Sequence, residues 1–287
     1  ARCPLELRAG VHAERVLVED TPTGRRAVGV EYVDADGSRH RARARFVVAA
    51  AGALNTAQLL LRSGLRNPAI GRYVGLHPLR LVYGLFDEIQ DAHRVYPISA
   101  HCMKFQTDED GGFVLEASTI MDPIAFATTI RDESGPLWGA PLVEAMRAYR
   151  RWVGVLAMVN DENNAAVRLD ENGREKLEVA FRPSEHERLD AALRFSRQAL
   201  QAAGATKICW TGLISTHTQG GCRMGDDPAR SVVDRNGESH EVKGLFVGDG
   251  SLVPRTLSVN PSLTIMALAT RLAEHLEMAM SDETVSS

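Results

Sequence analysis

The sequence is poor in several features that mark particular classes of protein. It has four cysteines in 287 residues and none in CxxC spacing, which excludes a disulfide scaffold and favours a reducing compartment. No apolar run approaches the ~20 residues that span a bilayer, and no charged-then-apolar leader segment opens the chain. We therefore expect a cytoplasmic protein, with peripheral membrane association left open.

Charge and composition exclude further classes. The net charge of -4 gives no electrostatic reason to expect a nucleic-acid partner. A hydrophobic content of 44% and a charged content of 24% exclude a disordered tail or a fibrous protein. A chain of this length can bury one large core or two moderate ones. Because it begins in mid-pattern at Ala1, we expect a processed product or a fragment.

The N-terminal part of the sequence predicts strands followed by a helix. β-rich runs, separated by turn signals, occupy 5–18, 27–33 and 40–49. Within the last of them, the apolar run 46–50 is typical of a strand that is buried on both faces. Gly52 then provides a tight turn into a helix over 55–62. Strand, glycine turn and helix in this order are the layout of a nucleotide-binding α/β layer.

The middle part of the sequence mixes strands with two helices. Strand-like runs occur at 79–86, 112–116, 153–159, 165–169 and 177–181. Helical spacing covers 141–151 and 184–203, and the second helix has Ser184 as the expected N-cap with Glu187 completing a capping box. This mixture predicts an antiparallel sheet that helices cover on one side.

One histidine of the C-terminal part stands beside a glycine loop. In His217-x-x-Gly220-Gly221 the glycines let the backbone approach a planar ligand, and a neutral imidazole is the usual general base near neutral pH. Taken alone, such a histidine is more often a structural or solvated loop residue. A metal site formed with Cys222 would lack a third ligand at a fitting spacing, so no metal is expected.

Two further patterns each have a structural and a functional interpretation. Asp249-Gly250 follows a short buried strand, where the carboxylate either forms an Asx turn or accepts hydrogen bonds from a ribose or ribityl chain. Asn260-Pro261 opens an apolar helix. Asn is a favoured N-cap, but free N–H groups at a helix start also stabilise negative charge on a ligand. The occurrence of all these patterns in one order favours the functional interpretation.

The order of these patterns resembles the C-terminal signature of the glucose–methanol–choline (GMC) oxidoreductases. The resemblance is specific at both ends of the chain and weak between about 80 and 208. Within that family the sequence is most similar to the long-chain fatty alcohol oxidase and dehydrogenase branch. The matching motifs are His217-x-x-Gly220-Gly221-x-x-Met224-Gly225, Gly244-Leu245-Phe246-Val247-x-Asp249-x-Ser251, Asn260-Pro261-x-x-Thr264, Gly52-Ala53-Leu54-Asn55-Thr56 and Leu76-His77-Pro78.

The resemblance implies an α/β (α+β) fold with a partial FAD-binding, Rossmann-like layer and a substrate domain whose mostly antiparallel sheet is covered by helices. It divides the chain into a first FAD-binding segment (1–76), a substrate-binding domain (77–208) and a C-terminal FAD-binding segment with the catalytic residues (209–287). The family's GxGxxG turn for the ADP moiety does not occur in this sequence. We therefore expect a separate FAD-binding portion as a partner, beside a hydrophobic alcohol substrate.

The resemblance also implies roles for single residues. His217 would take the hydroxyl proton of the alcohol while the carbinol carbon gives a hydride to flavin N5, which yields an aldehyde or ketone. Asn260 would hydrogen-bond the same oxygen and orient it. The helix that starts at Pro261 would stabilise the reduced flavin through the backbone N–H groups of Ser262 and Leu263. The expected FAD contacts are Ala13, Gly52, Asp249, Gly250, Pro261, Ser262 and Leu263.

Other interpretations stay open at this point. The chain could be a truncated or non-catalytic remnant that is unable to hold FAD alone. A metal-dependent hydrolase that uses His217, His240 and Asp249 is disfavoured. Four large side chains of the middle part are either the wall of an apolar substrate pocket or plain core residues: Trp138, Met146, Trp152 and Met158.

Overall fold

The computed structural model describes residues 5–118 and 122–284, so Cys3 lies outside it. The strands are β1 (His12–Thr21), β2 (Gly24–Val33), β3 (Arg39–Arg43), β4 (Val47–Ala49), β5 (Pro78–Leu85), β6 (His101–Cys102), β7 (Phe113–Ser118), β8 (Ile130–Asp132), β9 (Gly135–Pro136), β10 (Trp152–Val159), β11 (Ala166–Leu169), β12 (Glu175–Glu178), β13 (Lys207–Thr211), β14 (Ile214–Ser215) and β15 (Leu245–Val247). The α-helices are α1 (Ala53–Arg62), α2 (Pro123–Thr129), α3 (Ala140–Arg147), α4 (Pro183–Ala202) and α5 (Ser262–Thr284), and 3-10 turns are η1 (Ala92–Arg94), η2 (Tyr149–Arg151) and η3 (Gly250–Leu252). Among the described residues, no helix is both long and apolar enough to cross a membrane.

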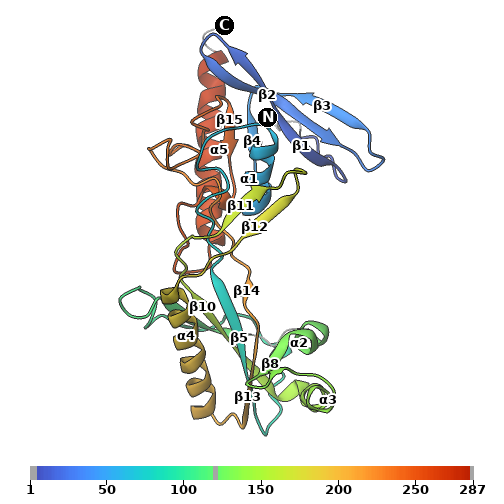
Figure 1. The fold of residues 1–287 in the computed structure, drawn as a ribbon, viewed down its shortest axis with the longest axis vertical. Coiled ribbons are helices and arrows are strands. Elements are labelled where there is room, and N and C mark those ends of the chain that lie inside the picture. Colours follow the sequence, from blue (N-terminus) through green and yellow to red (C-terminus); the bar gives the residue numbers. More distant parts are fainter. Residues whose placement is uncertain (1–4, 119–121, 285–287) are drawn as a thin grey trace.

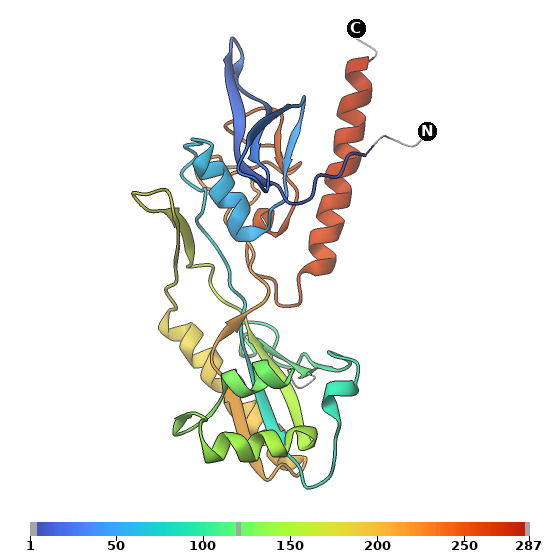
Figure 2. The same ribbon diagram turned by 90° about the vertical axis from the view of Figure 1, so that its right-hand side faces the viewer.

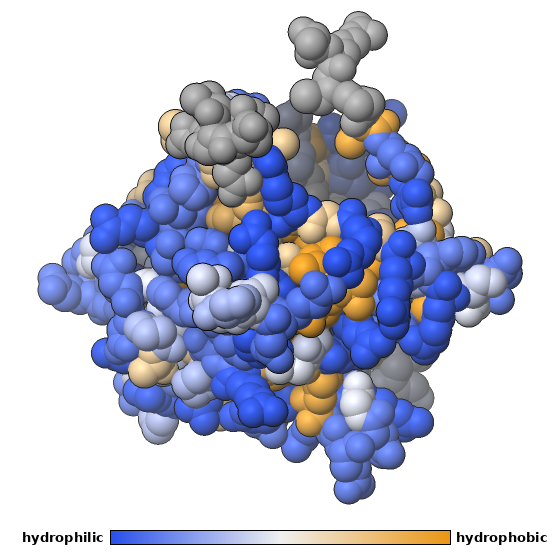
Figure 3. All heavy atoms as spheres, turned by 90° about the horizontal axis from the view of Figure 1, so that it is seen from above, coloured by the Kyte–Doolittle hydropathy of each residue, from blue (hydrophilic) through white to orange (hydrophobic). Residues whose placement is uncertain are grey.

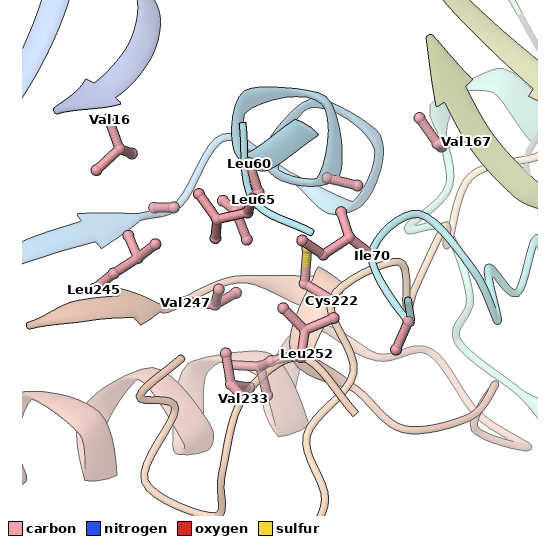
Figure 4. Packing of buried hydrophobic residues seen from close by; sticks show 14 of the residues in the cluster. Val16, Leu60, Leu65, Ile70, Val167, Cys222, Val233, Leu245, Val247 and Leu252 are labelled. Carbon is pink, nitrogen blue, oxygen red and sulfur yellow. The ribbon is translucent and has the colours of Figure 1, made fainter. Parts of the chain in front are cut away.

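Segments from both ends of the chain build one part of the molecule, which is the upper part of Figure 1. β1, β2 and β3 form an antiparallel sheet, and β4 pairs in parallel with β15, about 200 residues later in the chain. The α1 helix and the loops before β15 share one apolar core, in which Leu60, Cys222 and Leu245 are fully buried (Figure 4). The α5 helix stands along one side of this part (Figure 2).

The middle of the chain forms the lower part around a large, mostly antiparallel sheet. Its strand order is β6-β7-β10-β5-β13-β8-β9, and β14 adds to β5. The α4 helix packs on one face, where Leu189 and Ala192 meet Phe113. Phe126 of α2 and Ala145 of α3 pack on the other face, so the expectation of a sheet covered on one side is wrong (Figure 1).

Other local expectations need correction as well. The predicted strand at 40–49 is two strands, because the chain leaves the first sheet after β3 and enters the second at β4. Val48 keeps 44% of its surface exposed, so the expected burial of this run on both faces is wrong. Among the described strands, β4 has only β15 beside it. The predicted strand at 177–181 is instead β12, which ends at Glu178 after the Asp170–Gly173 turn.

The start of α4 differs from its prediction by two residues. Arg182 is the N-cap and Pro183 occupies the first turn, because proline has the φ angle of a helix and no N–H that must be satisfied. The capping carboxylate is therefore Glu185, whose side chain accepts hydrogen bonds from the backbone N–H of Arg182 (2.6 Å) and of Glu162 (2.8 Å). Ser184 instead donates its hydroxyl to the Glu162 carboxylate at 2.8 Å.

Replacing Glu185 by alanine tests this assignment. The variant leaves two backbone N–H groups without their acceptor, which should lower the free energy of unfolding by about 1–3 kcal/mol. The matched control is Glu187→Ala, since Glu187 is exposed on the same helix and should change stability by less than about 0.5 kcal/mol. Urea unfolding followed by circular dichroism compares them, and equal midpoints for the two variants would contradict the capping role.

Candidate active site

The edge of the α/β layer is held together by the Asp249 carboxylate. The parallel strands β4 and β15 end side by side, which is where open α/β sheets place their ligands. One carboxylate oxygen of Asp249 accepts hydrogen bonds from the backbone N–H of Gly52 (2.8 Å) and from the Thr56 hydroxyl, and the other accepts from Ser251 N (2.8 Å). Asp249 therefore joins the turn before α1 to η3 and fixes both.

The loop that carries His217 is bonded to this edge. Gly220 N donates to the Gly250 carbonyl and Cys222 N to the Ser251 carbonyl, both at 3.0 Å. Gly220 has a φ of 75°, and a Cβ there would lie 2.1 Å from a backbone oxygen, so only glycine fits this crossing. Gly250 also faces the first turn of α5, because a Cβ on it would meet the Ile265 side chain at 3.1 Å. The structure thus brings together the predicted residues Gly52, His217, Asp249 and Gly250 with the start of α5.

The start of α5 offers free donors beside this edge. Pro261 is buried, and its carbonyl accepts the first hydrogen bond of the helix from Ile265 N at 2.9 Å. Ser262 and Leu263 are exposed. Backbone N–H groups in a first helical turn have no partner inside the helix and lie at the positive end of its dipole. This end of α5 can therefore stabilise negative charge on a group bound next to Gly250.

His217 itself is half-buried between two side chains of the lower part. Its Nδ1 lies 3.1 Å from Met158 Sδ, and its ring centroid lies 5.3 Å from the ring centroid of His77. Burial lowers the pKa of His217 below its ordinary value. Burial, with a further contribution from His217, lowers the pKa of His77 to about 3. Both imidazoles are therefore neutral at neutral pH, and His217 has the protonation state that a general base requires.

His77 is a residue that the sequence patterns did not assign to the site. It is fully buried with a φ of 49°, and neither ring nitrogen has a hydrogen-bond partner within the described residues. The Asp161 carboxylate holds its backbone, accepting from Leu76 N (2.7 Å) and His77 N (3.4 Å). The motif Leu76-His77-Pro78 was the available signal, but the position of its ring beside His217 follows only from the tertiary structure.

Asn260 lies against Glu116, a second residue that the patterns missed. Glu116 is 1% exposed, and burial raises its pKa, whereas His101 and the Asn260 side chain oppose that rise. His101 Nδ1 lies 3.2 Å from a Glu116 carboxylate oxygen. In the β7–β10 register Glu116 faces Leu156, two residues from Met158, so Glu116 and Met158 point to the same face of the sheet. Asn260 and His217 therefore approach one face, although no hydrogen bond joins them among the described residues.

Some predicted residues lie apart from this group. Ala13 is an exposed residue of β1 that pairs with Tyr32, in the outer three-stranded sheet. Trp138 is 81% exposed, and Trp152 is a core residue whose indole N–H donates to the Ala145 carbonyl at 3.0 Å. His240 contacts Ser231 Oγ and the Gly225 carbonyl, each at 3.0 Å. Across 5–118 and 122–284, no three His, Cys, Asp or Glu residues are grouped as a metal site.

Three comparisons with known proteins identify the class to which this architecture belongs. Residues 1–79 and 140–269 match the N-terminal and C-terminal parts of the family described as GMC oxidoreductase. The fold is shared with pyridoxine 4-oxidase from Mesorbium loti (TM-score 0.70, 21% identity) over 93% of this chain and 57% of that one. It is shared with a formate oxidase of Aspergillus oryzae (TM-score 0.71, 15% identity) over 95% and 60%. The chain belongs to the GMC oxidoreductase family, whose members use FAD.

Among curated proteins, the chain is similar to enzymes with different named substrates. It is 30% identical to a long-chain-alcohol oxidase of Arabidopsis thaliana, over 96% of this chain and 42% of that protein. It is 33% identical to paromamine 6'-oxidase of Streptomyces fradiae, over 93% of this chain and 51% of that protein. The chain thus spans about half the length of the relatives that it matches.

The residues present fit one end of FAD and not the other. Gly52 has a φ of 88° and open space at its Cβ position, so a ligand can approach its backbone at the end of β4. The donors at the start of α5 suit a group that becomes negatively charged on reduction, as a flavin ring does. The sequence has no GxGxxG turn for the pyrophosphate. The described edge therefore fits the ring and ribityl end of the cofactor.

Replacing Asp249 by asparagine tests the bracing of this edge. The asparagine side chain has only one accepting oxygen. Its NH2 group must therefore face either the Gly52 N–H or the Ser251 N–H, which loses that hydrogen bond. We expect the free energy of unfolding to fall by about 2–3 kcal/mol. The control is Asp226→Asn, because the Asp226 side chain is 81% exposed. Urea denaturation measures the free energy of unfolding of both variants. If Asp249→Asn unfolds within about 0.5 kcal/mol of the control, Asp249 does not brace this edge.

Proposed function

We propose that this chain carries the proton-accepting and substrate-orienting residues for FAD-dependent oxidation of an alcohol CH–OH group to an aldehyde or ketone. The observation that carries the proposal is the placement of His217. Its half-buried, neutral imidazole is on a loop that is hydrogen-bonded to η3, next to the start of α5, and it faces the substrate-side surface of the large sheet. A base at the junction between a cofactor edge and a covered sheet face is suited to act on a bound alcohol.

Each residue has a separate task in this reaction. When bound, FAD supplies the acceptor for the hydride of the carbinol carbon. His217 accepts the hydroxyl proton, and Asn260, fixed against Glu116, hydrogen-bonds the substrate oxygen and orients its C–H bond. The first-turn N–H groups of α5, at Ser262 and Leu263, stabilise negative charge on the cofactor ring. Asp249 acts by holding the turns around Gly52 and Gly250 in place.

A hydrophobic alcohol is the substrate class that we propose. The sheet face near His217 presents apolar side chains of three neighbouring strands, namely Leu79, Val114, Leu156 and Met158. The similarity to a long-chain-alcohol oxidase supports this choice. The buried Glu116 carboxyl is the exception on this face, and together with the similarity to paromamine 6'-oxidase it makes a polar alcohol the alternative.

We further propose that a dinucleotide-binding segment outside this sequence completes the cofactor site. Apolar side chains are exposed where such a segment would pack: Val48 on β4 is 44% exposed, and Leu263 and Met266 on α5 are 76% and 58% exposed. Viewed from the end that carries both termini, the surface is largely hydrophilic around a central apolar area (Figure 3).

The competing hypothesis is a non-catalytic remnant. Absorbance spectra of the purified chain, alone and with that segment, decide between them, because a colourless complex after addition of FAD supports the remnant.

Replacing His217 by glutamine in the complete, FAD-loaded protein tests the base. Glutamine keeps the polar character of the side chain and cannot accept the proton, so kcat/KM for alcohol should fall about 10²–10⁴-fold. The flavin absorbance should stay at the wild-type level. His240→Gln is the matched control, because His240 has only structural contacts and should leave the rate within a few-fold. Near-wild-type turnover of His217→Gln would reject the base assignment.

The pH dependence of the same reaction provides a second test. Because burial lowers the pKa of His217, its neutral form persists below the ordinary histidine value of about 6.5. The kcat/KM for alcohol should therefore be constant above that pH and decrease only as the pH falls below it. His77 does not titrate in this range, since its pKa is about 3. If the acidic decrease of kcat/KM instead has its midpoint clearly above pH 6.5, a group other than His217 controls proton transfer.

A further inference from the structure

Of the two side chains beside the His217 ring, Met158 is a thioether, an unusual partner for a general base. Met158 Sδ lies 3.1 Å from His217 Nδ1, and Met158 is fully buried in β10 between β5 and β7. Its strand partners Leu79 and Val114 are buried as well, so the sulfur is held on a rigid part of the sheet. The sheet therefore supplies the Met158 side of the contact, and the loop that is hydrogen-bonded to η3 supplies His217.

The chemistry of sulfur determines which nitrogen carries the proton. A thioether has lone pairs and no hydrogen, so it can accept a hydrogen bond but cannot donate one. A neutral imidazole has one N–H, and the bond that one nitrogen makes fixes the state of the other. If Nδ1 donates to Met158 Sδ, then Nε2 carries the free lone pair.

We propose that Met158 is a positioning residue that fixes His217 as the Nδ1–H tautomer and leaves Nε2 unprotonated as the base for the alcohol. The catalytic consequence rests on the function proposed above, whereas the tautomer is a property of the chain itself. The Met158 thioether is uncharged, so it orients the His217 ring without favouring the addition of a second proton to that ring. A carboxylate in the same place would favour the imidazolium and raise the pKa of the base.

The other surroundings of His217 agree with this assignment. The second ring facing it is His77, which stays neutral and adds no charge. The backbone carbonyl of His217 accepts from the Gln219 side chain at 3.2 Å, which fixes the loop but does not involve the ring. Among the described residues, the ring of His217 has no carboxylate partner, and burial alone accounts for the lowered pKa.

The tautomer can be measured directly on the chain labelled with ¹⁵N-histidine. Long-range ¹H–¹⁵N spectra distinguish Nδ1–H from Nε2–H, and the His217 signals are those missing from His217→Gln. We expect Nδ1–H in the wild type and a loss of that preference in Met158→Leu, which keeps similar volume and removes the acceptor. Met146→Leu is the matched control, because Met146 packs in the same cluster of side chains and has no contact with His217 in the structure. It should leave the tautomer unchanged.

A second variant keeps the test decisive if Met158→Leu folds poorly. Met158→Gln places an amide of similar reach there, whose carbonyl can accept from Nδ1–H and whose NH2 can donate to an unprotonated Nδ1, so it should hold the ring but allow both tautomers. In the complete enzyme, kcat of Met158→Leu should fall roughly two- to tenfold, the factor to which one ordinary hydrogen bond corresponds, with KM little changed. Met158→Gln should recover part of that loss.

The outcomes separate this inference from the proposed function. An Nε2–H form of His217 in the wild type, or an unchanged Nδ1–H form in Met158→Leu, overturns the positioning role whatever the activity. If the tautomer behaves as expected but His217→Gln turns over alcohol normally, the proposed function fails while the role of Met158 in orienting the ring stands.

Discussion

The three hydrogen bonds of the Asp249 carboxylate connect turns that are 197 residues apart in the sequence, since Gly52 opens α1 and Asp249 opens η3. Nearly every feature of the candidate site depends on this junction. The His217 loop is hydrogen-bonded to Gly250 and Ser251, and the first turn of α5 packs on Gly250. A carboxylate buried among donors is costly to leave unmatched, so the two turns are fixed relative to each other. The chemistry at His217 is thereby placed by a residue that need not touch substrate.

The division of labour between the two parts of the molecule follows from this arrangement. The upper part contributes the edge where parallel strands end, and the lower sheet contributes a covered face with Met158 and Glu116 on it. The loop that carries His217 is hydrogen-bonded to η3, and Asn260 directly precedes α5, so both segments lead into the upper part. Each of the two residues nevertheless contacts a residue of the lower sheet. The site is therefore formed where cofactor edge and substrate surface meet, as is common for ligand sites between structural layers.

The sequence allowed the elements and the family to be predicted better than the details of packing. Buried strands such as β10 and β15 and the long helices α4 and α5 are evident from apolar runs and helical spacing. The N-cap of α4 was misplaced because Pro183 competes with Ser184 for the helix start, and both positions satisfy a simple capping pattern. Local sequence patterns do not distinguish between these two helix starts. The deciding contact is tertiary, namely the hydrogen bond that Glu162 N donates to the Glu185 carboxylate.

The same limit explains which site residues were missed. Glu116 has no local signature of function, and the Leu76-His77-Pro78 motif gives His77 no role, because both residues matter through their burial next to Asn260 and His217. The sequence left Met158 as either a wall residue of an apolar pocket or a plain core residue, since sequence does not show which ring its sulfur faces. Asp249 had both a structural and a functional interpretation, and the structure shows its structural contacts in full.

The isolation of β4 has a consequence for handling this chain. β4 is three residues long and hydrogen-bonds to β15 alone among the described strands, which leaves the backbone groups of its other edge available. An open strand edge beside an exposed valine is a template for pairing with another polypeptide. Because the edge is only three residues long, one short neighbouring strand would be enough to shield it.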